Sequence, residues 1–168
     1  FGGSGVGKSE IASLLALYFN RMGIGCYVLS GDNYPHRIPV FNDAERVRIF
    51  RTVGLKKLVG SGQYNNSIRS ALEQFWSQET DAAPEQCAEY PWLATYQAAG
   101  RDALRRYLGT RREQDYTELN GIIRAFKRGS KSLFLKRMGR VESERWYSEV
   151  SFAQIRILIV EWTHGGSP

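Results

Sequence analysis

The sequence has few residues of the kinds that hold structural metals or form disulfides. Among its 168 residues there are two cysteines, Cys26 and Cys87, and two histidines. The cysteines lie far apart and form no pair with metal-ligand spacing, so a cysteine-based metal site is not expected. We interpret both as reduced thiols, which are typical of a cytoplasmic protein.

Long apolar segments are also missing. No stretch approaches the roughly 20 apolar residues that a membrane-spanning helix needs, and no signal peptide is recognisable. Hydrophobic residues make up 42% and charged residues 24% of the chain, as in an ordinary soluble globular protein. We therefore expect a cytoplasmic protein of one domain with no membrane partner, and a homo-oligomer remains open.

The first residues of the chain form a phosphate-binding motif. Gly2–Ser9 matches the pattern G-x-x-x-x-G-K-[ST]. Glycines in such a loop let backbone N–H groups surround a phosphate, and the helix that follows directs its positive end toward it. Lys8 is expected to reach the β- and γ-phosphates of ATP, and the Ser9 hydroxyl to bind Mg²⁺. The predicted nucleotide-binding residues are Gly3, Ser4, Gly5, Val6, Gly7, Lys8, Ser9 and Glu10.

The pattern of apolar residues predicts an α/β protein. We expect helices over Lys8 to about Arg21, Asp43 to about Val59 and Tyr116 to Arg128, and strands over Cys26–Leu29 and Ile155–Val160. The expected fold is a P-loop NTPase-type open parallel sheet flanked by helices. Asp43 is expected to cap its helix after a loop that contains Pro35 and Pro39.

The middle and the ends of the chain complete this organisation. Residues 63–112 are predicted to be a mainly helical insertion in a single domain that spans residues 1–168. A phosphate-binding loop needs a strand before it, and only Phe1 precedes the motif here. We therefore expect a fragment whose first strand and C-terminal part are missing.

Two carboxylates follow predicted strands. Asp32 comes after Cys26–Leu29, and Glu161 ends Ile155–Val160. Open α/β sheets bind ligands at the carboxyl ends of their strands. We expect Asp32 to act as the catalytic base with Lys8 as its catalytic partner, and Glu161 to join Ser9 at the metal, although Asp32 as the metal ligand stays open.

The basic residues that follow Asp32 are candidates for substrate binding. His36, Arg37, Arg46 and Arg51 suit an anionic or polar substrate, because guanidinium groups pair with phosphate or sulfate. A solvated basic helix face is an equal alternative for the arginines. His164, three residues after Glu161, is a weaker candidate.

Residues 1–59 resemble the adenylylsulfate kinases. The resemblance rests on Gly2–Ser9, on Gly31-Asp32-Asn33, and on Glu45-Arg46-Val47 followed by Arg51-Thr52-Val53-Gly54. It implies that Arg46 and Arg51 contact the substrate.

Residues 115–166 resemble the uridine kinase and phosphoribulokinase group. The similar features are Asp115-Tyr116, a helix that ends in Lys127-Arg128-Gly129, and a strand that ends in Glu161-Trp162-Thr163-His164. In that group an Asp-x-(Phe/Tyr) element supplies the base, and Asp32 and Tyr34 match it, so Tyr34 is also predicted to bind the substrate. Both resemblances imply ATP-dependent phosphorylation of a hydroxyl on a small metabolite, with Mg²⁺ as cofactor.

Two other classes of protein are alternatives to a small-molecule kinase. A GTPase switch would carry an Asn/Thr-Lys-x-Asp motif, which does not occur in these residues. A nucleic-acid-associated ATPase would use the net charge of +6, but scattered arginines do not favour nucleic acid as the partner.

Replacement of the loop lysine tests the nucleotide-binding prediction. Lys8→Ala should weaken ATP binding strongly, because the ammonium group that compensates phosphate charge is lost. Titration calorimetry measures this effect, and an unchanged affinity would refute the assignment.

Overall fold

The chain forms two compact units, and the computed structural model describes residues 5–163 of it. The first, here the sheet unit, consists of Phe1–Asn42 and Leu108–Pro168. The second, here the helical unit, is Asp43–Tyr107. The helical unit thus starts earlier and ends earlier than the helical insertion that the sequence predicts at residues 63–112.

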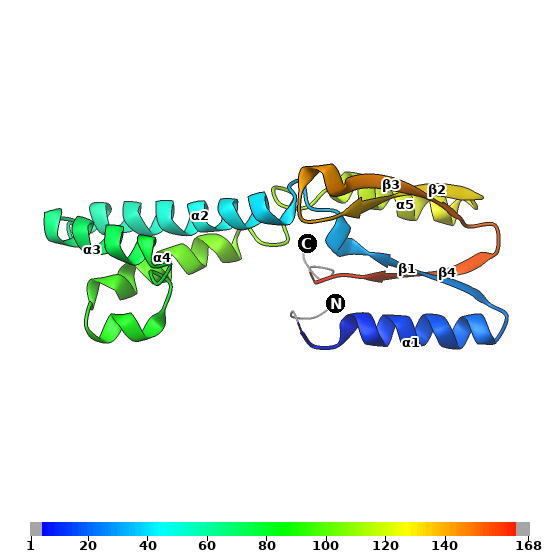
Figure 1. Ribbon diagram of the computed structural model, residues 1–168, viewed down its shortest axis with the longest axis horizontal. Helices are drawn as coiled ribbons and strands as arrows, with labels where there is room; N and C mark the ends of the chain where they lie inside the picture. Colours follow the sequence, from blue (N-terminus) through cyan, green and yellow to red (C-terminus); the bar gives the residue numbers. More distant parts are fainter. Residues whose placement is uncertain (1–4, 164–168) are drawn as a thin grey trace. The chain divides into compact units, whose positions relative to one another are not determined.

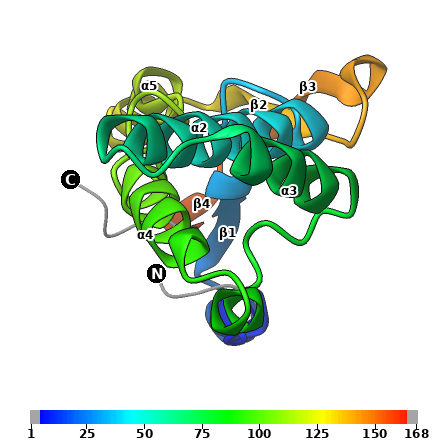
Figure 2. The same cartoon turned by 90° about the vertical axis from the view of Figure 1, so that its left-hand side faces the viewer.

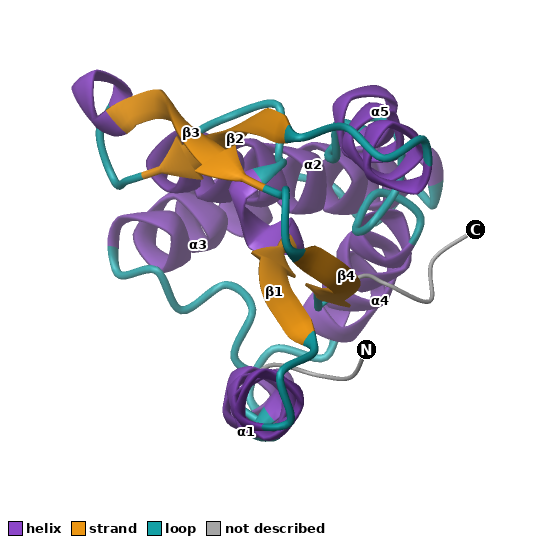
Figure 3. Ribbon diagram, turned by 90° about the vertical axis from the view of Figure 1, so that its right-hand side faces the viewer, coloured by secondary structure: helices purple, strands orange, loops and turns teal. Residues whose placement is uncertain are grey.

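The sheet unit is built on two parallel strands. Strand β1 (Gly25–Ser30) pairs with β4 (Ile155–Glu161), and Ser30 lies opposite Glu161 at the end of the pair. Helix α1 (Lys8–Arg21) lies along one face of this pair (Figures 1 and 3). The predicted parallel pairing of the two strands is confirmed, and the unit is of mixed α/β type with a small parallel sheet.

On the other face of the parallel pair lie elements of both α and β type (Figure 3). Helix α5 (Tyr116–Lys127) is followed by an antiparallel hairpin of β2 (Ser132–Met138) and β3 (Arg145–Ser151). The hairpin was not predicted from the sequence. Its apolar residues do not alternate regularly, so the period-2 signal of a half-buried strand is weak.

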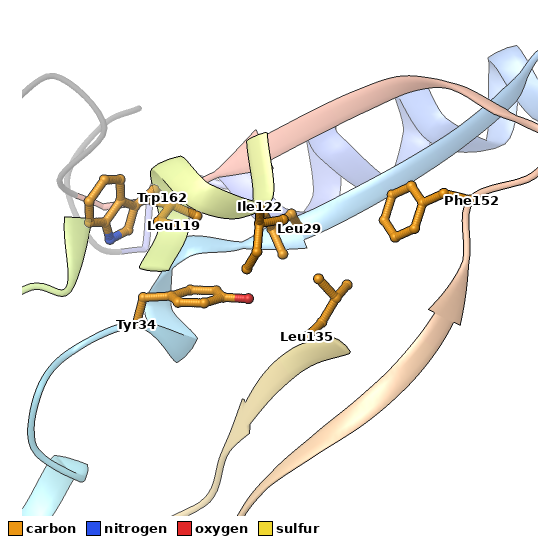
Figure 4. Close-up of a cluster of buried hydrophobic side chains, with 7 residues drawn as sticks. All are labelled: Leu29, Tyr34, Leu119, Ile122, Leu135, Phe152 and Trp162. Atoms are coloured by element: carbon orange, nitrogen blue, oxygen red, sulfur yellow. The ribbon is translucent and has the colours of Figure 1, made fainter. Parts of the chain in front are cut away.

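The core of the sheet unit lies between the parallel strands and these elements (Figure 4). Its buried side chains come from β1, α5, β2 and the segments that flank β1 and β4: Leu29, Tyr34, Leu119, Ile122, Leu135, Phe152 and Trp162. This core therefore fixes the ends of β1 and β4 relative to each other.

The outer side of α1 differs from a typical amphipathic helix. The predicted helix is present, but the apolar residues that repeat at helical spacing are 45–65% exposed: Ile11, Leu14, Leu15 and Tyr18. Ala12 alone in the helix is buried. Within residues 5–163 only β1 and β4 lie against this helix as a parallel sheet, and two strands cover only part of its apolar surface.

The helical unit is formed by three α-helices around its own core. Helix α2 (Pro39–Gly60) packs with α3 (Asn66–Ser77) and α4 (Trp92–Arg105), and a short 3-10 helix η2 (Pro84–Ala88) precedes α4 (Figures 1 and 2). The buried residues are Phe50, Leu58, Leu72, Phe75, Leu93 and Tyr96. A methyl group added at Gly54 of α2 would lie 2.6 Å from the Tyr96 ring, so the two helices approach closely there.

The start of α2 corrects one prediction. Asp43 was expected to cap this helix, but the helix begins four residues earlier, at Pro39. Proline is well suited to the first turn of a helix, because its fixed φ matches the helix and its missing N–H would have no partner there. The proline therefore starts the helix rather than extending the loop.

One buried carboxylate holds both passages of the chain between the units. The side chain of Glu113 is fully buried, and it accepts hydrogen bonds from Asn42 Nδ2 at 3.3 Å and from the Gly109 backbone N–H at 2.7 Å. Asn42 is the last residue before the helical unit, and Gly109 is the second residue after it. The segments that lead into and out of the helical unit are thus both hydrogen-bonded to one side chain of the sheet unit. We call the group of Asn42, Gly109 and Glu113 the neck.

The helices of the described chain are short or rich in charge. Over residues 5–163, none of them has both the length and the apolar character that crossing a membrane requires.

Two neighbouring residues of β2 test the position of the core. Leu135 is fully buried, whereas Phe134 is 62% exposed. Leu135→Ala should lower the free energy of unfolding by about 2–5 kcal/mol, because it removes buried methyl groups and leaves a cavity. Chemical denaturation followed by circular dichroism measures the loss. Phe134→Ala is the matched control, and an equal loss in both variants would contradict this burial pattern.

Candidate functional site

Two glycines in the described part of the glycine-rich loop have left-handed backbone conformations. Gly5 and Gly7 have φ values of 75° and 78°, a region that favours glycine. Gly7 is the N-cap of α1, and Lys8 and Ser9 are its first two residues. The first turn of a helix has N–H groups without partners inside the helix, and its end carries partial positive charge, so such an end suits an anion. Gly3 and Ser4 lie outside the described residues.

A small hollow of about 270 Å³ lies at this end of α1. It collects residues from three separate parts of the sequence: Gly5, Gly7, Lys8, Ser9, Glu10, Asp32, Glu161 and Thr163. Asp32, Glu161, Lys8 and Ser9, the residues with predicted catalytic or metal roles, therefore line one site. His164 lies outside the described residues.

The strand pairing explains how the two carboxylates meet. Ser30 and Glu161 are partners in the parallel register, and β1 continues directly into the 3-10 helix η1 (Gly31–Asn33). Asp32 is the middle residue of η1, so it lies just beyond the end of β1. Glu161 is the last residue of the neighbouring strand β4, at the same edge. Neither position depends on a long loop.

Close packing holds η1 in place. Trp162 is 6% exposed, and a methyl group added at Gly31 would lie 2.2 Å from its Cγ atom. The Trp162 ring also contacts the Tyr116 ring, with 5.1 Å between the centroids. On the other side, Asn33 Oδ1 accepts a hydrogen bond from the Met138 backbone N–H at 3.2 Å. Asp32 is thus fixed through both of its neighbours, an arrangement that sequence reasoning missed.

Tyr34 does not line the hollow. It is fully buried in the core of the sheet unit, and Lys136 Nζ lies 5.3 Å from its ring centroid. Burial, and to a smaller extent the Glu118 carboxylate, raise the pKa of Tyr34 to about 12. The phenol therefore stays protonated at neutral pH.

A partly buried ion pair lies next to Tyr34. Lys136, on β2, is 9% exposed at its side chain and pairs with Glu118 of α5. A lysine is rarely buried without a partner, because removing its charge from water is costly. The pair joins the hairpin to α5 beneath Tyr34. The sequence did not indicate this ion pair, because the strand that carries Lys136 was not predicted.

The other predicted substrate residues fall into two groups. His36 and Arg37 follow η1 in the sheet unit, where the His36 backbone N–H donates to Glu113 O at 2.9 Å and its Nε2 atom lies 3.0 Å from Arg111 O. Arg46 and Arg51 belong to the helical unit, where they pair with Asp43 at 3.0 Å and Asp81 at 2.8 Å. None of the four lines the hollow at α1.

The donor set of the hollow consists of oxygen atoms. Ser9, Asp32 and Glu161 offer one hydroxyl and two carboxylates, the ligand types that Mg²⁺ prefers. Residues 5–163 contain no group of three or more His, Cys, Asp or Glu side chains that could hold a metal by itself. Such a sparse set suits Mg²⁺, which usually keeps water and phosphate ligands in addition to one or two carboxylates.

The sheet unit thus combines a small parallel sheet with a helix whose N-terminus faces two strand-end carboxylates. The chain is 36% identical, over 167 residues, to the bifunctional alpha-galactosidase/sucrose kinase AgaSK of Mediterraneibacter gnavus. The aligned region covers 99% of this chain and 13% of that protein. No protein-family model matches the chain, and no solved structure matches it.

The contact between Gly31 and Trp162 gives a testable prediction. Gly31→Ala should lower the free energy of unfolding by about 1–3 kcal/mol, because the new methyl group overlaps the indole ring. Thermal or chemical denaturation measures the change, and Trp162→Leu in the same background should recover part of it.

Gly121 of α5 is the matched control. A methyl group added there meets no atom within 4 Å. Because alanine is the better helix former, Gly121→Ala should stabilise the protein by about 0.5–1 kcal/mol. A Gly31→Ala variant as stable as Gly121→Ala would show that the packing on Trp162 is not tight.

Proposed function

We propose that this chain is an ATP-dependent kinase that transfers the γ-phosphoryl group to a hydroxyl of a small carbohydrate. The observation that carries the proposal is the single hollow in which the glycine loop, Lys8, Ser9 and two strand-end carboxylates converge. The printed name of the relative, which includes sucrose kinase, supports a sugar as the acceptor.

The relative combines two activities, and the glycine motif indicates which of them this chain resembles. Glycoside hydrolysis generally uses a pair of carboxylates on either side of the glycosidic bond and has no need of a phosphate-binding loop. The Gly2–Ser9 motif, followed by a helix that begins at Lys8, has a direct use in binding a nucleoside triphosphate. We therefore assign the kinase activity to the aligned region.

Nucleotide binding would rest on the loop and the first turn of α1. The residues that we propose for it are Gly3, Ser4, Gly5, Val6, Gly7, Lys8, Ser9 and Glu10. Backbone N–H groups and the Lys8 ammonium group would compensate the charge on the phosphates. Ser9 and Glu161 would hold Mg²⁺, which would supply positive charge to neutralise the phosphates.

Asp32 is the proposed base that orients and deprotonates the acceptor hydroxyl. Phosphoryl transfer needs an aligned nucleophile and charge compensation, and Lys8 supplies part of the second. Asp32 is exposed, and the chain after it leads to the proposed acceptor-binding residues His36 and Arg37. Glu161, in contrast, is the last residue of strand β4. The packed neighbours Gly31 and Asn33 would keep Asp32 aligned without restricting access to solvent.

In the sheet unit, His36 and Arg37 are the proposed acceptor-binding residues. In the helical unit, Arg46 and Arg51 are proposed separately as ligand-binding residues. Tyr34 would serve a supporting role, because its side chain is fully buried and its hydroxyl stays protonated. The hydrogen bonds from His36 to Glu113 and Arg111 would hold the acceptor-binding segment against the neck.

Replacement of Asp32 separates catalysis from binding. Asp32→Asn should retain ATP binding but reduce turnover of the sugar by roughly 10²–10⁴-fold, the usual contribution of a general base. A coupled assay for ADP release measures turnover, and titration calorimetry measures ATP affinity.

Glu161→Gln is the companion variant. Its ATP affinity should fall in the presence of Mg²⁺ and change little without Mg²⁺, because the carboxylate is proposed to act through the metal. If Asp32→Asn instead bound Mg²⁺-ATP poorly and turned over normally at saturation, the roles of the two carboxylates would be exchanged.

A further inference from the structure

The helical unit holds a pocket of about 780 Å³ that is lined by equal numbers of positively and negatively charged residues. Three arginines and three carboxylates line it, and they lie on α2, on α4 and in the turn that follows α3: Arg46, Arg51, Arg101, Asp43, Glu79 and Asp81. A volume of this size is within the range of small-molecule sites. This pocket, here the arginine pocket, belongs wholly to the helical unit.

Its deepest charged group is fixed by a chain of hydrogen bonds. The Asp81 side chain is 5% exposed and accepts two hydrogen bonds from Arg51, at 2.8 and 3.2 Å. The Tyr96 hydroxyl donates to Asp81 at 2.8 Å, and Trp76 Nε1 donates to the Tyr96 oxygen at 2.9 Å. A bidentate pair that is held from behind in this way keeps Arg51 and Asp81 in one geometry.

The backbone of residues 81–83, which forms one wall of the pocket, is also held by hydrogen bonds. Gln97 Nε2 donates to the backbone oxygens of Asp81 at 3.1 Å and Ala83 at 2.8 Å. Arg101 donates to Ala82 O at 3.1 Å and to Gln97 Oε1 at 2.7 Å. The turn from residue 81 to 83 is therefore attached to α4 by two side chains.

Glu79, which also lines the pocket, ends α3 in a helix cap. It has a φ of 56°, and it is the one residue other than glycine with a positive φ among residues 5–163. The Thr80 backbone N–H donates to Phe75 O at 3.0 Å and the Glu79 N–H to Trp76 O at 3.3 Å, which are the two hydrogen bonds of a Schellman motif. This cap fixes the start of the turn that carries Asp81.

The chemistry of the lining selects the class of ligand. An anion would meet three carboxylates as well as three guanidinium groups, so the pocket offers it no net attraction. A sugar can donate its hydroxyl protons to carboxylates and accept hydrogen bonds from guanidinium groups at the same time. The apolar lining residues Val47, Phe50 and Leu104 can contact the C–H surface of a sugar ring.

We propose that the arginine pocket binds an uncharged mono- or disaccharide. The choice of a sugar as the ligand rests on the proposed function, whereas the pocket and its contacts are independent of that function. Arg46 and Arg51, which the sequence suggested for an anionic substrate, then recognise hydroxyl groups instead of sulfate or phosphate.

Titration calorimetry on the whole chain tests this proposal with three probes: sucrose, glucose and inorganic sulfate. Each is titrated with and without a non-hydrolysable ATP analogue and Mg²⁺. Sucrose or glucose should bind, and sulfate should neither bind in the pocket nor compete. Arg46→Gln and Arg101→Gln should each weaken sugar binding by about tenfold or more, as expected for the loss of a charge-assisted hydrogen bond.

Arg69→Gln is the matched control. Arg69 forms an exposed pair with Glu73 on α3, comparable to the pair of Arg46 with Asp43 on α2, and it does not line the pocket. Its sugar affinity should equal that of the unchanged protein. Thermal melts of all variants establish that each is folded.

The possible outcomes separate the pocket from the kinase activity. Absence of sugar binding, sulfate binding that Arg46→Gln abolishes, or sugar binding that neither pocket variant changes would overturn the proposed ligand. Sugar bound in the pocket without ATP-dependent phosphorylation would reject the kinase and keep the pocket. Phosphorylation of a sugar whose binding, measured by calorimetry, is unchanged in both pocket variants would keep the kinase and reject the pocket.

Discussion

The parallel pairing of β1 with β4 is the interaction on which the rest of the sheet unit depends. It joins two segments that the whole helical unit separates along the sequence, and its register places Ser30 opposite Glu161. Parallel strands end at the same edge, so one pairing brings the residues after both strands to the start of α1. A shift of register would move Glu161 away from Asp32 and disperse the oxygen donors of the hollow.

Packing beside this pairing converts a shared edge into a defined geometry. Gly31 has no side chain, so the Trp162 ring can lie directly against its backbone, and Asn33 is tied to β2 by a hydrogen bond. The buried Lys136–Glu118 pair links the hairpin to α5 behind them. Removing one partner of such a pair leaves an uncompensated charge in a poorly solvated place, so neither residue can be lost alone without a cost in stability.

The sequence predicted those parts of the fold whose signals are local. The Gly2–Ser9 motif, the helical repeat from Lys8 and the apolar run Ile155–Val160 each identify an element without reference to the rest of the chain. The roles of Trp162 and Glu113 could not be predicted, because each depends on partners distant in sequence. The hairpin was missed for a similar reason, since Lys136 occupies a buried strand position that is normally apolar.

The neck at Glu113 has a consequence for how such a protein can diversify. Both passages of the chain meet at one side chain of the sheet unit, and the residues between them carry a separate hydrophobic core. A segment whose two ends lie together can be exchanged for another of different length without moving the strands that flank it. The helical unit is anchored in this way, so changes in its length or sequence need not disturb the pairing of β1 with β4.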